Sequence, residues 1–416
     1  MALQPPRLPF TVRALNAAGS AATRFGIRIG DLGMDALLGS AARETGLKDF
    51  GDAFFREPLS VFLESLESEA ALTTLGRVSA RAEITRGLKN RLYMTDVLNQ
   101  SPEIVRGPIV KPIFILGLPR TGTSILHELL AQDPDNRVPM TWEVHNLWPP
   151  PDRATYSRDP RIEQTDEFLS RIDQVLPGFK HIHPMGAQLP QECVALMAHD
   201  FASLQFHTTY RVPTYQQWLE ELDVAPVYAS HRKQLQYLQW KCPAEQWVLK
   251  SPGHLWTLDA LLDEYPDALI VQTHRDPLKV LASLVSLVTT LRGLASTRVD
   301  PSEIAEDWAR RLGHGLDLTM KVRDSRKLPP SRIFDMHFHE LLQDEIAMVR
   351  RIYNHFDREL SAEGESRMRK FLAEHSRDQR GRHTYSFADT GLNPDEERQR
   401  FSRYQQCFDV PSERTA

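Results

Sequence analysis

The chain has 416 residues, which is long enough for one large domain or two modest ones. Its hydrophobic content of 41% and charged content of 25% are typical of a soluble globular protein. The formal net charge of −5 excludes a broadly basic surface, so we expect no nucleic-acid partner. Any anion site has to be built from a few placed basic side chains.

The cysteines and the apolar segments bear on the cellular compartment. Three cysteines lie far apart without metal-ligand spacing, which favours a reducing compartment over a disulfide framework: Cys193, Cys242 and Cys407. No run of about 18 apolar residues occurs, and no apolar core follows the N-terminus. We therefore expect no transmembrane helix, no secretory signal and a cytoplasmic location.

The first 30 residues form a basic arm, with four arginines and no acidic residue before Asp31. This composition is typical of a packed N-terminal arm. It is also found in organelle-targeting segments and in tails that bind acidic surfaces. Peripheral membrane contact therefore stays open.

Residues 31–106 are predicted to be mostly helical, because apolar residues recur there at helical spacings: Leu59, Phe62, Leu63 and Leu66. No catalytic constellation is apparent in this stretch. We interpret residues 1–108 as a helical N-terminal extension that packs on the following domain or on a partner chain. A homodimer stays open.

The stretch from 112 to 131 predicts a strand, a tight loop and a helix in succession. An apolar run from Ile113 to Leu116 is typical of a buried parallel strand. A loop follows from Gly117 to Gly122, and a helix opens at Thr123. Such a loop aims free backbone N–H groups and the positive end of a helix dipole at one point, which suits a phosphate. The alternative is a plain turn without a ligand.

The motif Gly117-x4-Gly122-Thr123-Ser124 nearly matches the phosphate loop of nucleotide hydrolases, but Thr123 stands where that signature has lysine. Arg120 adds a positive charge inside the loop. The sequence Gly-Leu-Pro-Arg-Thr-Gly-Thr-Ser resembles the 5′-phosphosulfate loop of sulfotransferases that use 3′-phosphoadenosine 5′-phosphosulfate (PAPS). The resemblance implies a PAPS-binding role for five residues, of which the first also acts in catalysis: Arg120, Thr121, Gly122, Thr123 and Ser124.

The block from about 140 to 240 lies between core strands and is predicted to be a helical insertion. Helical patterns cover residues 160–176, 190–206 and 214–240. Insertions of this kind can cap a ligand cleft and form an acceptor pocket. Its aromatic residues suit a hydrophobic acceptor, or equally an ordinary core: Trp148, Phe168, Phe179, Phe201, Phe206, Tyr210, Tyr215 and Trp218.

Strand and helix patterns alternate over the rest of the chain. Strands are predicted at 247–250, 268–273 and 332–336, with helices at 255–264, 277–291, 302–324, 339–356 and 361–376. This alternation predicts an α/β fold, a parallel sheet flanked by helices. Ligands of such sheets lie outside the carboxyl ends of the strands, so the loops at 117, 250 and 274 should converge on one edge. The resemblance implies a P-loop NTP hydrolase-like sulfotransferase fold over residues 109–416.

The segment from His274 to Ser283 carries a second candidate phosphate site. Arg275 leaves a strand end, and Ser283 lies eight residues later, about two turns into the next helix. A guanidinium with a hydroxyl suits a phosphate monoester. The spacing resembles the sulfotransferase 3′-phosphate site, which implies that Arg275 and Ser283 bind PAPS. Taken alone, an arginine that merely pairs with Asp276 is the alternative.

The segment from Lys250 to His254 is the candidate catalytic loop. Sulfuryl transfer needs a base for the acceptor proton and cations for charge on the leaving oxygens. The segment resembles the strand-end loop of sulfotransferases, which implies that His254 is the base and that Lys250 stabilises the transferring group. Cytosolic members place these two residues two apart, whereas here they are four apart. One alternative is that His254 starts a helix and has only a packing role. Glu192 and Glu143 therefore stay alternative bases.

Two further groups of residues bear on cofactor and metal binding. The resemblance implies that a basic loop closes over the 3′-phosphate, and Arg380 and Arg382 suit that role, with a solvated turn as the alternative. Histidines gather in the middle block without zinc-site spacing: His181, His183, His199 and His207. Sulfuryl transfer needs no metal, so we expect none.

The resemblance covers most of residues 109–390 and points to the bacterial branch of the family. It implies an enzyme that moves a sulfuryl group from PAPS to a hydroxyl or amine of a small, hydrophobic acceptor. Two alternatives stay open. One is a nucleotide phosphotransferase or NTPase on a P-loop scaffold, which the missing lysine disfavours. The other is a catalytically inactive nucleotide-binding protein.

Overall fold

A parallel sheet forms the centre of the molecule. The computed structural model describes residues 3–27, 29–176, 179, 184–375 and 386–414. Within them, five strands follow the order β2-β3-β1-β4-β5, and every paired strand is parallel, as predicted. The strands are β1 (Ile113–Gly117), β2 (Asn136–Arg137), β3 (Gln246–Lys250), β4 (Leu269–His274) and β5 (Ile333–His337).

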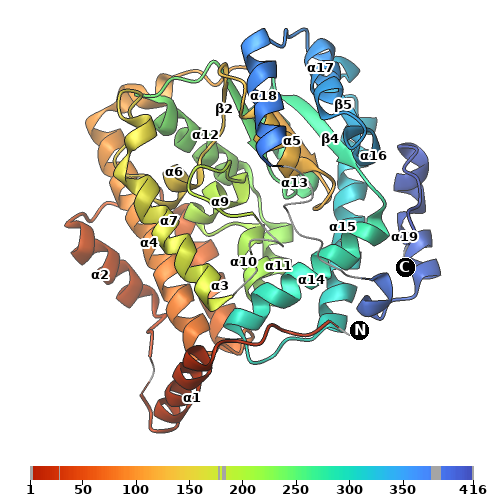
Figure 1. Ribbon diagram of the computed structural model, residues 1–416. Helices are drawn as coiled ribbons and strands as arrows, with labels where there is room; N and C mark the ends of the chain where they lie inside the picture. Colours follow the sequence, from red (N-terminus) through yellow and green to blue (C-terminus); the bar gives the residue numbers. More distant parts are fainter. Residues whose placement is uncertain (1–2, 28, 177–178, 180–183, 376–385, 415–416) are drawn as a thin grey trace.

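Helices cover both faces of the sheet (Figure 1). Phe114 and Leu116 of β1 belong to one apolar layer, whereas Ile113 and Ile115 belong to the other. Successive strand residues point to opposite faces, so a continuous apolar run requires cover on both sides. The first layer is built by α12 (Ala225–Gln239), α13 (His254–Glu264), α14 (Pro277–Ala295) and α15 (Pro301–Asp324). The second is built by α5 (Thr123–Leu130), α17 (Glu345–His355) and α18 (Ala362–Glu374).

Three N-terminal helices and the insertion share one hydrophobic core. These helices are α2 (Met34–Thr45), α3 (Arg56–Ser68) and α4 (Thr74–Gln100), whereas α1 (Phe10–Arg24) lies against α4 outside this core. Phe62 of α3 packs against Phe206 of α10 (Leu204–Thr209) and Tyr215 of α11 (Pro213–Glu221), with ring centroids 4.3 and 5.2 Å apart. The extension is therefore helical, as expected, and it is built together with the insertion. The boundary at residue 108 stays a prediction.

The insertion is more broken than predicted. It contains α6 (Thr141–His145), α7 (Pro160–Val175), α9 (Cys193–Met197), α10, α11 and α12. The single helix predicted for 190–206 is wrong, because Phe201 adopts a left-handed conformation (φ 58°) and separates α9 from α10. The helix predicted for 214–240 is divided as well, since the Asp223 side chain accepts a hydrogen bond from the Ala225 N–H and starts α12 afresh. As a result, α9 and α10 are separate short helices, and residues of both line the active-site cavity described below.

The remaining elements complete the two layers. The helix predicted for 339–356 is divided into α16 (Phe338–Leu341) and α17, and α19 (Pro394–Cys407) packs on α15. Short 3-10 turns are η1 (Ala53–Phe55), η2 (Pro102–Arg106), η3 (Tyr156–Arg158), η4 (Ala198–Asp200), η5 (Pro330–Arg332) and η7 (Phe387–Thr390). Helix α14 is long and apolar enough to cross a membrane, but most of it is covered by protein, including α4, α10 and α15.

Candidate active site

The loop between β1 and α5 has the conformation of a phosphate cradle. Gly122 has φ 89° and Arg120 has φ 66°, so two residues of the loop are left-handed. A Cβ atom at Gly122 would lie 2.9 Å from the Phe338 ring, and one at Gly117 would lie 2.1 Å from the Thr273 hydroxyl. Only glycine fits such close approaches without strain. The backbone therefore turns tightly into the N-terminus of α5, the arrangement that binds phosphate.

Thr121 holds this loop in shape. Its hydroxyl donates to the carbonyl of Leu118 at 2.6 Å and contacts the hydroxyl of Thr273 on β4 at 2.5 Å. The Thr121 side chain is 0% exposed. The Thr121 side chain therefore fixes the loop to the sheet, and its predicted role in binding stays a prediction.

Lys250 and Glu192 meet beside the loop. Lys250 ends β3 and is 4% exposed, and its ammonium donates to the Ser124 hydroxyl at 3.3 Å. The same ammonium forms an ion pair with the carboxylate of Glu192, which precedes α9. The predicted convergence of the loops at 117 and 250 is thus confirmed by a direct contact. A lysine of the neighbouring strand thus lies beside the phosphate loop.

A cavity of about 290 Å³ opens at this point. Its polar lining residues include Arg120, Thr123, Ser124, Glu192 and Lys250. Its apolar lining residues include Leu204, Leu284, Leu287, Leu291 and Trp308. A few convergent polar groups in an otherwise apolar cavity are typical of a small-molecule site.

His254 does not lie in this cavity. It begins α13 and is 0% exposed, with Nδ1 2.8 Å from the Tyr228 hydroxyl and its ring edge-on to Phe114 at 5.2 Å. Burial holds the pKa of His254 well below its usual value. The side chain is enclosed in the layer of α12 and α13, so this geometry does not support His254 as the base, and that role stays a prediction.

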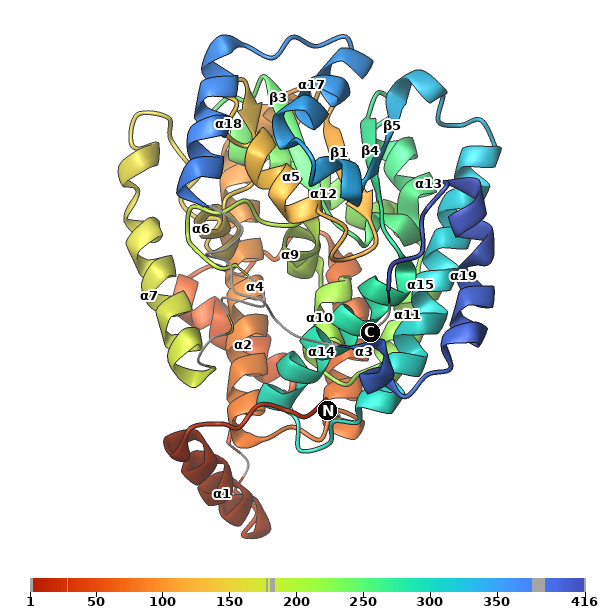
Figure 2. The same cartoon turned by 45° about the vertical axis from the view of Figure 1, so that its right-hand side comes forward.

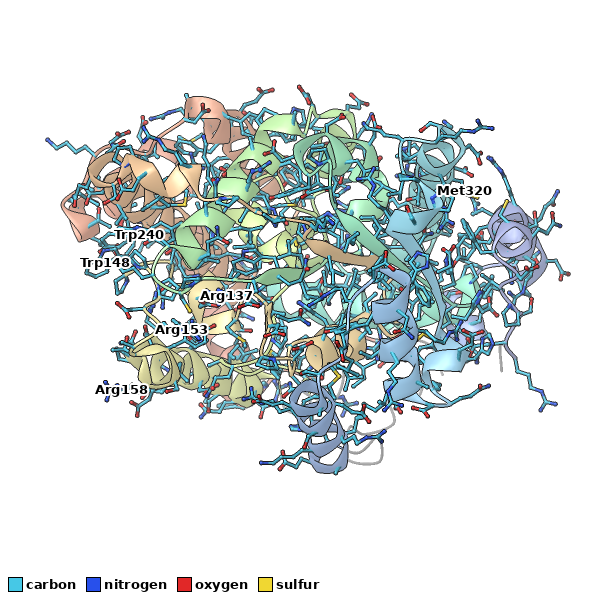
Figure 3. All side chains as sticks on the ribbon, turned by 90° about the horizontal axis from the view of Figure 1, so that it is seen from above. Arg137, Trp148, Arg153, Arg158, Trp240 and Met320 are labelled. Atoms are coloured by element: carbon cyan, nitrogen blue, oxygen red, sulfur yellow. The ribbon has the colours of Figure 1, made fainter. Side chains whose placement is uncertain are left out.

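Of the two alternative bases, the structure brings only Glu192 to the cavity. Glu143 is 0% exposed and forms an ion pair with Arg137 at 2.7 Å. It also accepts hydrogen bonds from the Met140 N–H at 2.9 Å and the Tyr156 hydroxyl at 3.0 Å. Figure 3 shows Arg137 well inside the outline of the molecule. These contacts give Glu143 a structural role, and the geometry does not support it as a base.

Arg275 lies against the phosphate loop but is held by the C-terminal segment. Its Nη1 donates to the carbonyl of Arg120 at 3.0 Å, and its guanidinium lies 4.3 Å from the centre of the Phe338 ring. Its Nε and Nη2 donate to the two carboxylate oxygens of Glu413 at 2.8 and 3.1 Å. Ser283 is buried in α14 at 4% exposure, and no hydrogen bond joins it to Arg275 within the described part of the chain.

The remaining predicted residues give no further site. Arg380 and Arg382 lie outside the described residues, as do His181 and His183. His199 and His207 are buried and hydrogen-bonded elsewhere. Within the described residues, no group of three metal-ligating side chains comes together.

Several residues of the site carry no signal in the sequence. Glu413 lies 138 residues from Arg275 along the chain, in a segment without a motif. Gln191 and Gln205 line the cavity from two sides of the break at Phe201. Their place depends on a left-handed residue that no local pattern predicts. Only the position of Gln191, directly before a candidate base, offers a hint.

A phosphate loop at the carboxyl edge of a parallel sheet, with a lysine and a carboxylate facing an apolar cavity, defines a group-transfer enzyme that uses an anionic donor. The model of the sulfotransferase family matches residues 112–362, and the chain belongs to this family. The match starts one residue before β1 and ends at the first residue of α18, so it spans the whole sheet.

Mycobacterial sulfotransferases are similar to this chain. It is 26% identical over 290 residues to the omega-hydroxy-beta-dihydromenaquinone-9 sulfotransferase Stf3 of Mycobacterium tuberculosis, covering 64% of this chain and 67% of the relative. The crystal structure of sulfotransferase STF1 from Mycobacterium tuberculosis aligns with a TM-score of 0.80 and 34% identity, covering 90% of this chain and 100% of that one. Sulfotransferase STF9 from Mycobacterium avium aligns with a TM-score of 0.85 and 29% identity, covering 92% and 98%.

Proposed function

We propose that this sulfotransferase transfers a sulfuryl group from PAPS to the hydroxyl of a hydrophobic acceptor, with Lys250 and Glu192 as its catalytic pair. The observation that carries the proposal is the cavity in which the phosphate loop, this pair and an apolar lining meet. Family membership supports the reaction class. The choice of donor rests on the resemblance of the loop and on its fit to a phosphate.

PAPS supplies a sulfuryl group that is bonded to a phosphate oxygen. In the proposal, the backbone N–H groups at the start of α5 hold that phosphate, together with Arg120, Thr123 and Ser124. Arg275 and Ser283 are assigned to the 3′-phosphate. The Lys250 ammonium lies against Ser124, and it stabilises negative charge on the leaving oxygen there.

Glu192 is the proposed base. Its carboxylate forms an ion pair with Lys250, and both side chains line the cavity. Glu192 takes the proton of the acceptor hydroxyl as the acceptor oxygen bonds to sulfur. The bond between sulfur and the phosphate oxygen breaks, and its electron pair stays on that oxygen beside Lys250. No atom is left over and no metal is required.

The acceptor is assigned as an alcohol on an apolar body. Leu284, Leu287 and Leu291 of α14, with Trp308 of α15, supply apolar lining to the cavity. The mycobacterial relative is named for an omega-hydroxy acceptor, which supports a hydroxyl over an amine. Burial of an alkyl chain contributes about 0.8 kcal/mol for each methylene group.

Calorimetric titration with adenosine 3′,5′-bisphosphate, with ATP plus Mg²⁺ as the comparison, tests the donor. We expect micromolar binding of the bisphosphate and much weaker binding of ATP. Preference for ATP would indicate that the protein is a phosphotransferase and not a sulfotransferase. Transfer of radiolabelled sulfate from PAPS to dodecanol then tests turnover. Binding of the bisphosphate without transfer to any alcohol would favour the inactive nucleotide-binding protein.

For partners, we propose that the N-terminal arm contacts an anionic lipid surface. Large apolar side chains are exposed there beside the arginines: Phe10 (75%), Phe25 (85%) and Ile27 (60%). Figure 2 shows α1 projecting from the body of the molecule. Basic segments with exposed aromatic side chains bind such surfaces through charge and apolar insertion.

Cosedimentation should occur with phosphatidylglycerol vesicles and not with phosphatidylcholine vesicles. It should be lost in the double variant Phe10→Ser and Phe25→Ser, and binding that ignores lipid charge would contradict the proposal.

A cytoplasmic location and a homodimer stay predictions. Gel filtration with light scattering would test the second. A monomer at micromolar concentration would remove it.

A further inference from the structure

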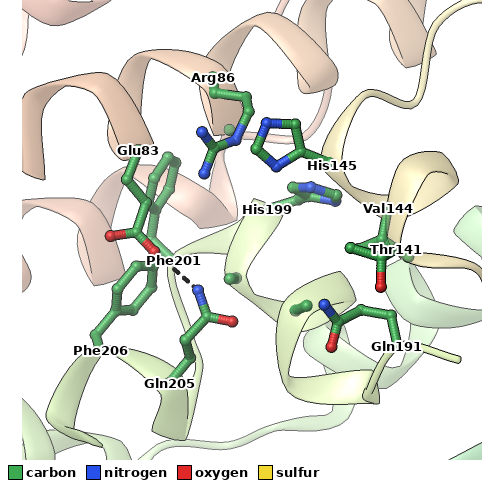
Figure 4. A pocket seen from close by; sticks show the side chains of 13 residues that line it. Glu83, Arg86, Thr141, Val144, His145, Gln191, His199, Phe201, Gln205 and Phe206 are labelled. Carbon is green, nitrogen blue, oxygen red and sulfur yellow. Dashed lines mark hydrogen bonds between the residues drawn. The ribbon is translucent and has the colours of Figure 1, made fainter. Parts of the chain in front are cut away.

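A second, polar cavity adjoins the acceptor end of the active site. It measures about 110 Å³ and lies between α4, α6 and the segment from α9 to α10. Gln191 and Gln205 line both this cavity and the active-site cavity. Figure 4 shows Arg86 and His145 at its upper end and these two glutamines at its lower end. An acceptor seated at Glu192 therefore has a neighbouring chamber within reach.

The guanidinium of Arg86 points into this chamber (Figure 4). Within the described residues it makes no hydrogen bond and no ion pair, and its recorded contact is with the Phe168 ring, 5.5 Å from the guanidinium carbon. Removal from water lowers the pKa of Arg86. Arg86 is half-buried, so its guanidinium has lost part of its contact with water without gaining an acceptor, which is unfavourable. Such a group is expected where a ligand supplies the missing acceptor.

Glu83, the nearby acidic residue, does not act as the hydrogen-bond acceptor of Arg86. Its Oε1 accepts from the Gln205 amide at 2.8 Å, and its Oε2 accepts from the Tyr210 hydroxyl at 2.9 Å. Glu83 influences Arg86 through charge, but no ion pair joins the two side chains. It therefore offsets part of the Arg86 charge while leaving its N–H donors to the cavity.

His145 stands beside Arg86 and adds a second donor. Burial, then the charge of Arg86, lowers the pKa of His145 to about 3, so the ring is neutral and carries one N–H. Its side chain makes no hydrogen bond to any residue that the structure describes, and it packs on Phe168 at 4.5 Å. His199 differs, because both of its ring nitrogens are bonded, to Gln234 at 2.9 Å and to Asn90 at 3.1 Å. His199 is part of the wall, whereas His145 faces the space.

We propose that Arg86 and His145 form a subsite for a second oxygen-bearing group of the acceptor, a carboxylate or a carbonyl. The acceptor is then bifunctional, with its hydroxyl at Glu192, its apolar body along α14 and its oxygen function at Arg86. Donors dominate this end of the chamber, and oxygen is the acceptor they match. The inference rests on the proposed function, because it places the hydroxyl of the same molecule at the catalytic pair.

Matched probes test the subsite in the full-length protein. Dodecanol, omega-hydroxydodecanoic acid and the corresponding omega-hydroxy methyl ketone are titrated into protein saturated with adenosine 3′,5′-bisphosphate. They are then compared as acceptors by kcat/KM with PAPS. We expect at least one of the two oxygen-bearing probes to exceed dodecanol by about tenfold or more, the size of a hydrogen bond to a charged group. Preference for the acid alone identifies a carboxylate site, and preference for the ketone as well identifies a carbonyl site.

The variant Arg86→Gln should remove this preference, and His145→Phe should reduce it by a smaller factor. Arg43→Gln is the matched control, because Arg43 is exposed on α2 and loses the same charge. Thermal unfolding checks that each variant is folded. The comparison of the three probes on the wild-type protein needs no variant. The proposal therefore stays testable even if a variant fails to fold.

Equal affinity and equal kcat/KM for the three probes overturn the subsite, and so does a preference that persists in folded Arg86→Gln. Binding of none of the three probes overturns it too. These outcomes are distinct from failure of the proposed function. That failure would appear as no binding of the bisphosphate, or as no sulfate transfer to any alcohol.

Discussion

The two predicted phosphate sites of this chain lie at neighbouring strand ends, but they are held in different ways. The loop after β1 is fixed by bonds within the protein, such as those of Thr121 to Leu118 and Thr273, and it opens on the cavity. Arg275, after β4, is bonded to a carboxylate of its own chain. One site is preformed, whereas the other already contains an internal anion.

The difference lies in the segment that closes each site. Glu413 is tied down by its own N–H, which donates to the Asp276 carboxylate at 2.6 Å, and Arg398 pairs with that same carboxylate at 2.7 Å. A phosphate at Arg275 would have to exchange with the Glu413 carboxylate, because both use the same N–H donors. We therefore expect affinity at this end to depend on a competition within the chain, and chemistry at the loop end to depend on fixed geometry.

The largest effect should come from the loop end. Lys250→Ala removes the ammonium beside Ser124 and leaves Glu192 without its ion pair. We expect kcat to fall by about a hundredfold to a thousandfold, as when one group that stabilises a developing charge is lost. Initial rates with PAPS and dodecanol measure it. Lys233→Ala, on the exposed face of α12, is the control. Loss of bisphosphate affinity with kcat unchanged would give Lys250 a binding role only.

Removal of Arg275 should have a smaller effect, and on binding. Arg275→Ala takes away the guanidinium assigned to the 3′-phosphate, so we expect affinity for adenosine 3′,5′-bisphosphate to fall by about tenfold to a hundredfold. Calorimetry measures it, with Arg158→Ala as the control. Figure 3 places Arg158 at the outer edge of the molecule, where it is exposed. Wild-type affinity in the Arg275 variant would contradict the assignment.

Competition between the Glu413 carboxylate and a phosphate for Arg275 predicts a gain in bisphosphate affinity when the carboxylate loses its charge. Glu413→Gln keeps the shape of the side chain but removes its charge, so the Arg275 guanidinium is released more readily to a phosphate. Ion pairs of partly exposed side chains contribute about 0.2–1 kcal/mol, which corresponds to an increase in bisphosphate affinity of roughly fivefold at most. Glu359→Gln, an exposed change remote from the site, is the control. Unchanged or weaker binding by the Glu413 variant would show that the carboxylate does not compete.

The same contrast separates what the sequence could and could not predict. The parallel sheet, the loop and Lys250 follow from local patterns, because strand ends of such a sheet share an edge. The base does not follow, since residue 254 starts a helix and its direction depends on Tyr228 of α12, which binds His254 from 26 residues away. The Glu413 contact is also nonlocal, and it joins two ordinary charged residues. The directions of the His254 and Arg275 side chains could not be predicted, because in each case a contact distant in sequence decides them.

The smallest predicted effect is on how the free energy of unfolding depends on pH. It comes from His274, the neighbour of Arg275 in the chain. His274 is almost wholly buried at the end of β4, with Nε2 2.8 Å from Asp335 and Nδ1 3.0 Å from the Tyr404 hydroxyl. Burial lowers the pKa of His274 despite Asp335, and the charges of His337 and Arg323 act in the same direction. A neutral ring satisfies both bonds, because Nε2–H donates to the carboxylate and Nδ1 accepts from the hydroxyl.

Because its folded pKa is depressed, this histidine favours folding at pH values above its unfolded pKa of about 6.5. As the pH falls below that value, the unfolded chain takes up the proton first and stability is lost. One such group changes the free energy of unfolding by no more than about 1.4 kcal/mol per pH unit. Urea unfolding at about pH 7.5 and about pH 5.5 measures this slope, and His274→Gln should reduce it. An equal slope in the variant would mean that folding leaves the pKa of His274 unchanged, which contradicts the prediction. A steeper slope in the variant would mean that His274 is charged in the folded protein, bonded as an imidazolium to Asp335. The Tyr404 contact would then have to be made with the tyrosine oxygen as acceptor.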